Sequence, residues 1–138
     1  MEFVQTDKAP SAIGPYSQAV IANGMVYTSG QIALTPDGVM LEEDVVVQTK
    51  QVLKNLEAIL VEAGSSMDRV IKTTIFIDSM DDFTTINEIY EKAFGLHKPA
   101  RATVAVKTLP KNALVEIDAI ALVDWCFVFK QNLKLIWV

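Results

Sequence analysis

Three ionisable residues in the last third of the chain are of types that bind or activate small polar molecules. Arg101 begins one run of small and β-branched residues, and Glu116 and Asp118 stand inside a second. A guanidinium can clamp a carboxylate with a planar fork of donors, and a carboxylate can position or activate water. A buried charge is expensive unless it is paired. These groups therefore either pair with one another or face a pocket, and spacing alone slightly favours structural ion pairs.

Two predicted strands within residues 98–123 carry these groups. A turn at residues 109–112, with Pro and Asn, separates two runs rich in Val, Ile and Ala. Because side chains alternate across a strand, Arg101 shares one face of the first run with Thr103 and Ala105. One face of the second run contains Val115, Ile117, Ala119 and Ala121, and the other contains Leu114, Glu116, Asp118, Ile120 and Leu122.

The rest of the chain completes the order β-β-β-α-β-α-β-β. The dipeptide N-G at residues 23–24 predicts a type I′ hairpin turn, and Asp44 and Gly64 predict the cap and the end of a helix. A second helix is capped by Asp81 or Asp82. The other expected elements are strands at 4–6, 17–22, 25–29 and 69–78, and a helix at 45–63. The second helix is expected to end near residue 94.

These elements predict an α+β fold, with one mixed sheet and two helices on a single face. In strand 69–78, Ile71 is expected to face the same way as Ile75 and Ile77. The sheet face without helices is too apolar for a monomer in water, so we expect other subunits to bury it. The residues assigned to that face are Thr74, Phe76, Thr103, Ala105, Ile120 and Leu122.

Composition and charge exclude several classes of protein. The 138 residues suit one domain, and a net charge of −5 with a pI near 4.8 argues against a nucleic-acid binder. With one cysteine, Cys126, and one histidine, His97, we expect no internal disulfide, no His-rich metal site and no Ser/His/Asp triad. We find neither a secretory signal nor an apolar run that spans a bilayer, so we expect a cytoplasmic protein.

Three further positions stand out on local grounds, each with a structural alternative. Tyr16 follows a Gly-Pro bend, where an aromatic side chain can also simply pack on a tight turn. Gly30 follows Ser29 and indicates a bulge or a close approach of the backbone to another group. Asn87 lies one position off the apolar stripe of the second helix, where an ordinary solvated residue is the alternative.

Six segments, in order between residues 2 and 123, resemble one known family. They are residues 13–19 (I-G-P-Y-S-Q-A), 28–32 (T-S-G-Q-I), 72–77 (K-T-T-I-F-I), 83–90, 99–106 (P-A-R-A-T-V-A-V) and 114–121 (L-V-E-I-D-A-I-A). On these residues the chain resembles the reactive-intermediate deaminase family (RidA/YjgF). The resemblance implies a chorismate-mutase-like fold and a homotrimer whose sheets enclose a barrel. It also implies clefts between subunits that hydrolyse 2-imino acids, such as 2-iminobutanoate and 2-iminopropanoate, to 2-keto acids and ammonia.

The same resemblance implies roles for individual residues. Arg101 matches the arginine that binds the substrate carboxylate, and Glu116 matches the acid that positions or activates the attacking water. Tyr16 matches a tyrosine that packs on the substrate side chain with its hydroxyl near the water. The remaining substrate-binding positions are the backbone at Ser29 and Gly30, the carbonyl of Thr103, and Asn87. An imine is already activated, so no metal, cofactor or covalent nucleophile is expected. Asp118 is expected to be structural, paired with Lys72 or Lys107.

The chain departs from the family pattern in two places. Thr103 stands where many relatives carry a cysteine, which argues against thiol-based redox or chlorination-triggered holdase behaviour, whereas deamination needs no thiol. Residues 1–123 form the expected deaminase-family domain, and residues 124–138 form an atypical apolar extension without a counterpart. We interpret the extension as non-native or poorly ordered. A strand added to a sheet edge and a hydrophobic patch docked on a neighbour stay open.

Three other functions compete with imine hydrolysis. A non-catalytic trimer could sense 2-keto acids or amino-acid intermediates in the same clefts; Arg101 suits both functions, and Glu116 separates them. An RNA-cleaving translation inhibitor is opposed by the acidic pI and the lack of a basic groove. A holdase chaperone is opposed by Thr103 and by the lack of long disordered tails. The expected partners are a small 2-imino or 2-keto acid and copies of the chain, with no nucleic acid and no membrane.

Overall fold

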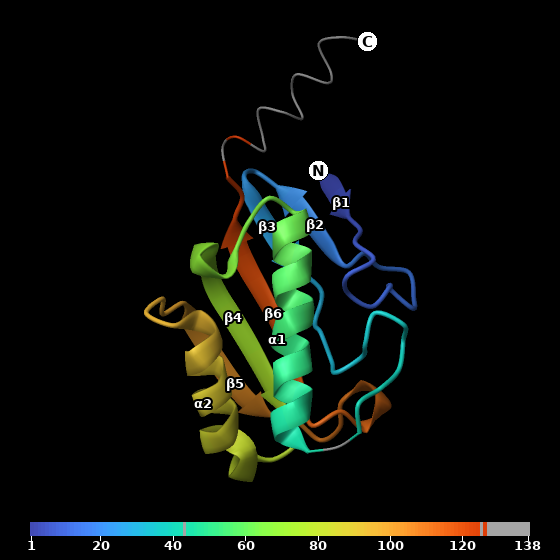
Figure 1. Ribbon diagram of the computed structural model, residues 1–138, viewed down its shortest axis with the longest axis vertical. Coiled ribbons are helices and arrows are strands. Elements are labelled where there is room, and N and C mark those ends of the chain that lie inside the picture. The colour runs from blue at the N-terminus through green and yellow to red at the C-terminus, as the bar shows by residue number, and fades with distance from the viewer. Residues whose placement is uncertain (43, 125, 127–138) are drawn as a thin grey trace.

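The computed structural model describes residues 1–42, 44–124 and 126, and it shows a six-stranded sheet with two α-helices on one face (Figure 1). The strands are β1 (Glu2–Val4), β2 (Ala19–Ala22), β3 (Met25–Thr28), β4 (Val70–Ile77), β5 (Ala100–Ala105) and β6 (Val115–Leu122). The α-helices are α1 (Val45–Glu62) and α2 (Phe83–Phe94), and 3₁₀ helices lie at η1 (Met67–Arg69), η2 (Met80–Asp82) and η3 (Pro110–Asn112). This order confirms the predicted α+β series. The chorismate-mutase-like label and the trimeric barrel stay predictions.

The hairpin between β2 and β3 forms where the sequence predicted it. Asn23 and Gly24 have φ angles of 52° and 74°, the left-handed values that a type I′ turn requires at both central positions. The strands then pair in antiparallel register from Ala22 opposite Met25 to Ala19 opposite Thr28. A turn with matching twist therefore sets the register of this part of the sheet.

The first helix has the predicted ends, and the second begins directly after Asp82, one of the two predicted capping residues. Asp44 Oδ1 accepts a hydrogen bond from the Val47 amide at 2.9 Å, and Gly64 after α1 has a φ of 77°. At α2, Asp82 occupies the N-cap position without a side-chain hydrogen bond. The preceding 3₁₀ turn is closed instead by Ser79, whose Oγ accepts from the Asp81 amide at 3.1 Å.

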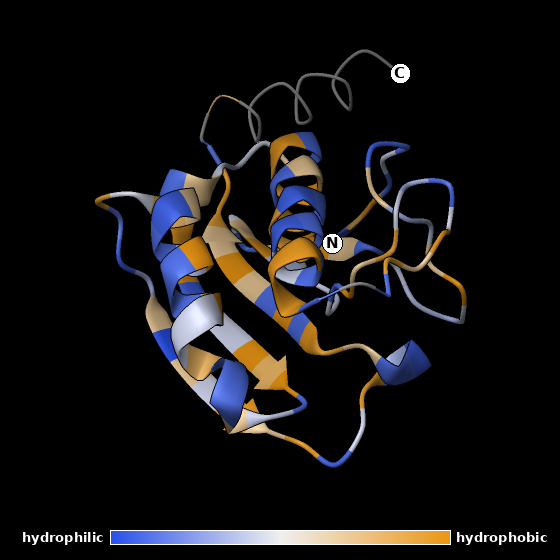
Figure 2. Cartoon of the chain, turned by 60° about the horizontal axis from the view of Figure 1, so that its bottom comes forward, coloured by the Kyte–Doolittle hydropathy of each residue, from blue (hydrophilic) through white to orange (hydrophobic). Residues whose placement is uncertain are grey.

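The core lies between the two helices and the sheet. Figure 2 shows hydrophobic stripes on both helices and a largely apolar sheet. Burying each large aliphatic side chain contributes about 1.5–3 kcal/mol, so this layer dominates the stability of the fold. The largest fully buried core side chains include Leu56, Ile59 and Leu60 of α1, Ile86 of α2, and Ile75, Ile77 and Ile117 of the sheet.

The predicted alternation along β4 is wrong at its first residues. Val70 is fully buried, and Ile71, which was expected to face the core, is 40% exposed. A register irregularity between Val70 and Lys72 in the pairing with β6 explains the reversal, because an extra residue turns the next side chain to the opposite face. From Thr73 onward the alternation is as predicted.

The two strands that carry Arg101 and Glu116 are not neighbours. The strand order β1-β2-β3-β6-β4-β5 places β4 between them, antiparallel to β6 and parallel to β5. Arg101 lies beside the buried Thr73, on the face covered by the helices, whereas Glu116 lies beside Phe76 on the uncovered face. The interpretation of Arg101 and Glu116 as an ion pair within one chain is therefore wrong.

The same register corrects the predicted composition of the uncovered face. Thr103 and Ala105 pair with the buried Ile75 and Ile77, so they lie on the helix side of the sheet and not on the open side. Lateral neighbours share a face, so the uncovered face instead carries Ala102 and Val104 of β5. Its other members include Tyr27 of β3, Lys72, Thr74 and Phe76 of β4, and Glu116, Asp118, Ile120 and Leu122 of β6.

Gln18 holds the segment before β2 in place. Its side chain is 1% exposed, and its Oε1 accepts from the Thr6 amide at 2.7 Å. Its Nε2 donates to the carbonyls of Thr6 and Pro10 at 3.0 and 2.9 Å. Because Thr6 bonds to this side chain, β1 ends at Val4, and the predicted strand at 4–6 is shifted by two residues toward the N-terminus.

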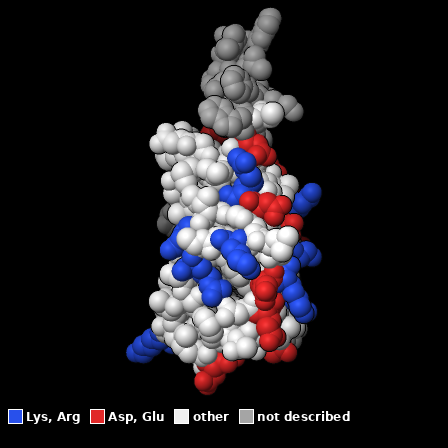
Figure 3. Space-filling view, turned by 90° about the vertical axis from the view of Figure 1, so that its left-hand side faces the viewer, with Lys and Arg blue, Asp and Glu red and all other residues white. Residues whose placement is uncertain are grey.

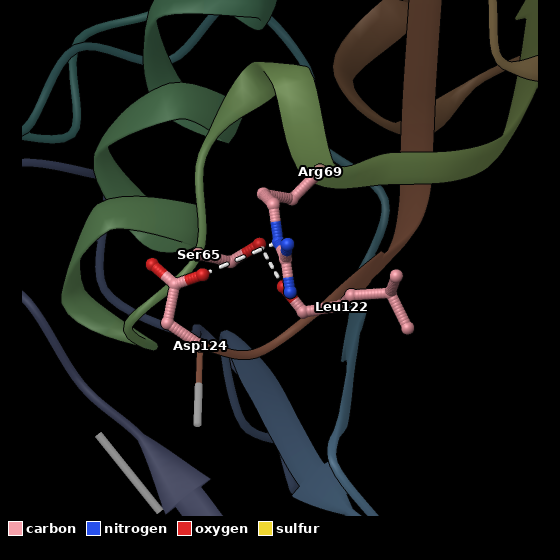
Figure 4. Close-up of polar contacts among 4 residues, drawn as sticks. All are labelled: Ser65, Arg69, Leu122 and Asp124. Atoms are coloured by element: carbon pink, nitrogen blue, oxygen red, sulfur yellow. Dashed lines mark hydrogen bonds and ion pairs between the residues drawn. The ribbon is translucent and has the colours of Figure 1, made fainter. Parts of the chain in front are cut away.

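The end of β6 is fastened to the turn before β4 (Figure 4). Ser65 Oγ donates to the Leu122 carbonyl at 2.6 Å, and Arg69 Nε lies 3.3 Å from Asp124 Oδ1. Both ionic side chains are exposed, so the pair contributes at most about 1 kcal/mol. The predicted extension at 124–138 lies outside the described residues except for Asp124 and Cys126.

We expect Gln18→Leu to lower the free energy of unfolding by about 2–3 kcal/mol, because it leaves buried backbone groups of residues 6–10 without partners. Chemical denaturation measures this change. As a control, Gln5→Leu alters an exposed glutamine and should change stability by less than about 0.5 kcal/mol. Equal stability of the two variants would contradict the role assigned to Gln18.

Candidate active site

Four of the predicted site residues line one cavity of about 350 Å³, which we call the Glu116 cavity. Tyr16, Ser29, Gly30 and Glu116 supply its polar side, and residues 10–13 form one rim. Ile32, Leu34 and Pro110 add an apolar wall. The cavity therefore combines a carboxylate with an apolar surface that suits a small, partly hydrophobic molecule.

Glu116 packs directly over Gly30. A Cβ atom at residue 30 would collide with the Glu116 carboxylate oxygen and would lie 3.0 Å from its Cδ. Gln31 and Ile117 exchange backbone hydrogen bonds of 2.9 and 3.1 Å, which hold residues 29–31 against β6. The predicted close approach at Gly30 is confirmed, and the group that approaches is the candidate catalytic acid.

Tyr16 stands at the edge of this cavity with 53% of its surface exposed. Its amide donates to the Gly14 carbonyl at 2.8 Å, and its hydroxyl accepts from the Ile13 amide at 3.4 Å. Ser29 Oγ donates to the Ser17 carbonyl at 2.6 Å and so ties the loop to the end of β3. Tyr16 therefore closes a tight turn and also presents its ring to the cavity.

The surroundings of the Glu116 carboxyl group favour its protonated form. Burial raises its pKa above the ordinary value, and the negative charge of Asp118 raises it further. Burial also raises the pKa of Asp118, against the lowering effect of hydrogen bonds from Thr74 and of the Lys72 charge. Within the part of the chain that the structure describes, Asp118 has no ion pair with Lys72 or Lys107 within 4.0 Å. The expected pairing is therefore wrong for one chain, and Lys72 acts on Asp118 only at longer range.

Arg101 and Asn87 line a second cavity of about 330 Å³, which we call the Arg101 cavity. It lies between α2 and the start of β5, and its lining includes the Lys98 cation as well as the Glu91 carboxylate, so the two cations outnumber the one anion. The Arg101 guanidinium carbon lies 5.0 Å from the ring centre of Tyr90 and 5.7 Å from that of Phe83. Figure 3, which views this side of the molecule, shows Lys and Arg side chains gathered in the middle of the face. The cavity suits a small anion.

The predicted site is thus divided between two places on one chain. The sheet separates the Arg101 cavity on the helix side from Glu116 on the uncovered side. Thr103 lines neither cavity. Its Oγ1 is buried, and we find no hydrogen-bond partner for it among the described residues. The structure brings Tyr16, Ser29, Gly30 and Glu116 together, but it does not bring Arg101, Asn87 or Thr103 to them.

Sequence reasoning missed two residues that organise these cavities. Gln18 holds the backbone of residues 6–10, which leads into the rim of the Glu116 cavity. Tyr90 belongs to the apolar stripe of α2 and is not among the predicted site residues, yet its ring also lies against Arg101. A phenol within an apolar stripe is a signal that could have found Tyr90, because a buried hydroxyl needs a partner.

Two kinds of feature are absent from residues 1–42, 44–124 and 126. No group of three or more His, Cys, Asp or Glu side chains in that part of the chain is arranged to hold a metal ion. Its helices include none that combines the length and the apolar character needed to cross a membrane.

Comparisons of the sequence and of the structure with known proteins agree on one family. The family model described as Endoribonuclease L-PSP matches residues 6–123. The mouse 2-iminobutanoate/2-iminopropanoate deaminase is 48% identical over 121 residues, which are 87% of this chain and 90% of that protein. The putative regulator AldR of Lactococcus lactis is 50% identical over 122 residues, which are 88% of this chain and 97% of that protein. The crystal structure of Escherichia coli TdcF with bound serine superposes with a TM-score of 0.85 at 44% identity, covering 90% of this chain and all of that one.

We expect Asp118→Asn to lower the pKa of Glu116, because it removes a like charge on the same face of β6. The value should stay above that of an ordinary glutamate, since burial, the larger cause, remains. Carboxyl ¹³C NMR titration measures the shift. Asp37→Asn, in an exposed loop, is the control and should leave Glu116 unchanged. An unchanged or raised Glu116 pKa in Asp118→Asn would contradict this electrostatic coupling.

Proposed function

This chain belongs to the Endoribonuclease L-PSP family, and from that membership we propose that it hydrolyses reactive 2-imino and 2-enamino acids, such as 2-iminobutanoate and 2-iminopropanoate. The products are 2-keto acids and ammonia. A mouse relative at 48% identity carries the name of this activity, and the related TdcF structure contains serine, a small amino acid with a carboxylate. The observation that carries the proposal is the pair of cavities, one lined by the Arg101 guanidinium and one by the Glu116 carboxylate.

Each charged group has a role in this reaction. Arg101 clamps the substrate carboxylate through two parallel hydrogen bonds, which a lysine cannot reproduce. Glu116 accepts a proton from water as the water oxygen bonds to the imine carbon, and it passes this proton to the imine nitrogen. In the resulting carbinolamine the hydroxyl proton moves through Glu116 to the amino nitrogen. The C–N bond then breaks to release ammonia as the C–O bond becomes a carbonyl. A raised pKa makes the Glu116 carboxylate a stronger base for these proton transfers than an ordinary glutamate. Tyr16 borders the substrate side chain from the rim of the Glu116 cavity.

The site is completed by a second copy of the chain. In a 2-imino acid the carboxylate is bonded directly to the imine carbon, so one substrate must contact Arg101 and Glu116 at close range. Within one chain these residues lie on opposite faces of the sheet. A closed ring of copies can place the Arg101 side of each chain against the Glu116 side of the next. We therefore propose a homotrimer in which Ser29, Gly30, Tyr16 and Glu116 of one chain meet Arg101, Asn87 and the Thr103 carbonyl of another.

The exposed apolar surface supports this assembly. Tyr27, Val104 and Leu122 on the uncovered face remain 44%, 45% and 39% exposed in a single chain. A monomer rarely leaves such residues together in water. Burial of this face between copies would also remove water from the surroundings of Glu116 and strengthen the electrostatic interactions there.

A non-catalytic sensor of 2-keto acids is the second candidate function. The name of the Lactococcus lactis relative, a putative regulator, favours it. Both functions need Arg101, but only hydrolysis needs the Glu116 carboxylate. Glu116→Gln separates them, because a sensor variant would keep its ligand affinity and its cellular effect. The description of the family as endoribonuclease suggests RNA cleavage, which the net charge of −5 disfavours.

We expect Arg101→Ala to reduce kcat/KM for imine hydrolysis by about 10²-fold, the loss expected for a charged bidentate contact of nearly 3 kcal/mol. Arg101→Lys should recover only part of the loss. The assay generates the imine in place with a threonine/serine dehydratase or an amino-acid oxidase and follows the acceleration of keto-acid release. Light scattering verifies that each variant keeps the wild-type mass. Acceleration that persists in Arg101→Ala would show that the clamp is assigned to the wrong residue.

Mixed oligomers test whether the site is shared between chains. Arg101→Ala and Glu116→Gln should each be nearly inactive, and co-refolding them in equal amounts should restore about a quarter of the wild-type activity, since one interface in four then has both intact groups. A mixture of Arg101→Ala with the double variant Arg101→Ala/Glu116→Gln is the control and stays inactive. If mixed oligomers form, as mass spectrometry would show, and no activity returns, the shared site is wrong.

A further inference from the structure

The position of Arg101 in the sheet does little by itself to restrain its side chain. It is an exposed side chain on the edge strand β5, and we find no carboxylate paired with it among the described residues. An arginine side chain carries about 2 kcal/mol of rotamer entropy, which binding must otherwise remove. Some other contact must therefore restrict the guanidinium if it is to meet a carboxylate in one geometry.

Tyr90 supplies that contact from α2. The guanidinium carbon lies 5.0 Å from the centre of the Tyr90 ring, within the range of a cation–π interaction, and 5.7 Å from the Phe83 ring. Two rings from one helix thus flank one guanidinium. The aromatic faces attract the cation but do not neutralise its charge, so its donors remain free for a carboxylate.

The Tyr90 ring is itself tightly held. It is 8% exposed, and its hydroxyl shares a hydrogen bond of 2.7 Å with the hydroxyl of the fully buried Thr73. Its ring packs on Phe94 at a centroid distance of 4.4 Å. Thr73 is also the lateral neighbour of Arg101 across the β4–β5 ladder. The Tyr90 side chain therefore contacts two neighbouring strand residues. Its hydroxyl bonds to Thr73, and its ring lies against Arg101.

We propose that Tyr90 is a positioning residue whose ring holds the Arg101 guanidinium in the orientation that binds the substrate carboxylate. This role rests on the proposed function, because it assigns Arg101 to the substrate. Tyr90 acts through Arg101 and not on the reacting atoms. Its loss consequently weakens substrate binding and leaves the chemical step nearly unchanged.

Substitutions at Tyr90 separate the ring from the hydroxyl. Tyr90→Leu keeps an apolar side chain but removes the ring, and should raise KM by about tenfold, within the range of a cation–π contact, with kcat within about twofold of wild type. Tyr90→Phe keeps the ring and its contact with Phe94, and should raise KM by less than about threefold. Ile86→Ala is the matched control, since it removes buried packing on the same helix without touching Arg101, and its KM should stay at the wild-type value.

NMR gives a readout that does not depend on turnover. The chain has two arginines, Arg69 and Arg101, so the Nε–H spectrum contains few signals, and Arg101→Lys assigns the one from Arg101. An aromatic ring beneath the guanidinium shifts this signal upfield. The shift should persist in Tyr90→Phe and largely disappear in Tyr90→Leu, with Arg69 as the internal reference.

The outcomes distinguish this inference from the proposed function. If wild-type protein fails to hydrolyse imines, the proposed function fails, and the Arg101 Nε–H signal still tests the contact with Tyr90. If hydrolysis occurs, an unchanged KM and an unchanged Nε–H shift in a folded Tyr90→Leu oligomer would overturn the positioning role. Equal losses in Tyr90→Phe and Tyr90→Leu would overturn it as well, because the hydroxyl and not the ring would then be the active group.

Discussion

The pleat of the sheet around β4 is the constraint on which the proposed site depends. Strands β5 and β6 pair with opposite edges of β4, and lateral partners must share a face. Arg101 is aligned with Thr73 and Glu116 with Phe76, residues of opposite orientation in the same strand. No rotamer change carries a side chain through a hydrogen-bonded sheet. One copy of the chain therefore cannot bring the Arg101 guanidinium and the Glu116 carboxylate to one small molecule, and the proposed site needs a second copy of the chain.

The two charged groups are restrained by neutral contacts rather than by opposite charges. The Glu116 carboxylate packs over Gly30, beside the backbone pairing of Gln31 with Ile117, and the rings of Tyr90 and Phe83 lie next to the Arg101 guanidinium. An ion pair would fix each group equally well, but it would also occupy the hydrogen bonds that a substrate needs. Burial then raises the pKa of Glu116 without a dedicated partner, and Asp118 adds to the effect. Different contacts thus determine the position of the Glu116 carboxylate and its pKa.

Features that depend on a few neighbouring residues could be read from the sequence. The hairpin at Asn23 and Gly24, the cap at Asp44 and the alternation along β6 follow from local backbone geometry and side-chain period. The close approach at Gly30 was also readable, because a glycine inside a strand pattern indicates crowding. Local patterns did not predict the β-bulge after Val70 or the bond between Gln18 and Thr6, since neither changes the hydropathy pattern.

Sequence alone determined which residue types were available for chemistry, and the resemblance to a family determined which of them to combine. Only the tertiary structure decided where they lie. Runs 98–105 and 115–122 look like consecutive strands of one hairpin, yet β4 separates them, because a strand far away in sequence offers both edges for pairing. Because β5 pairs with β4 and not with β6, Thr103 lies on the helix side of the sheet, and Arg101 lies next to Tyr90 of α2. Strand order is a long-range property of packing, and the local period of a sequence does not encode it.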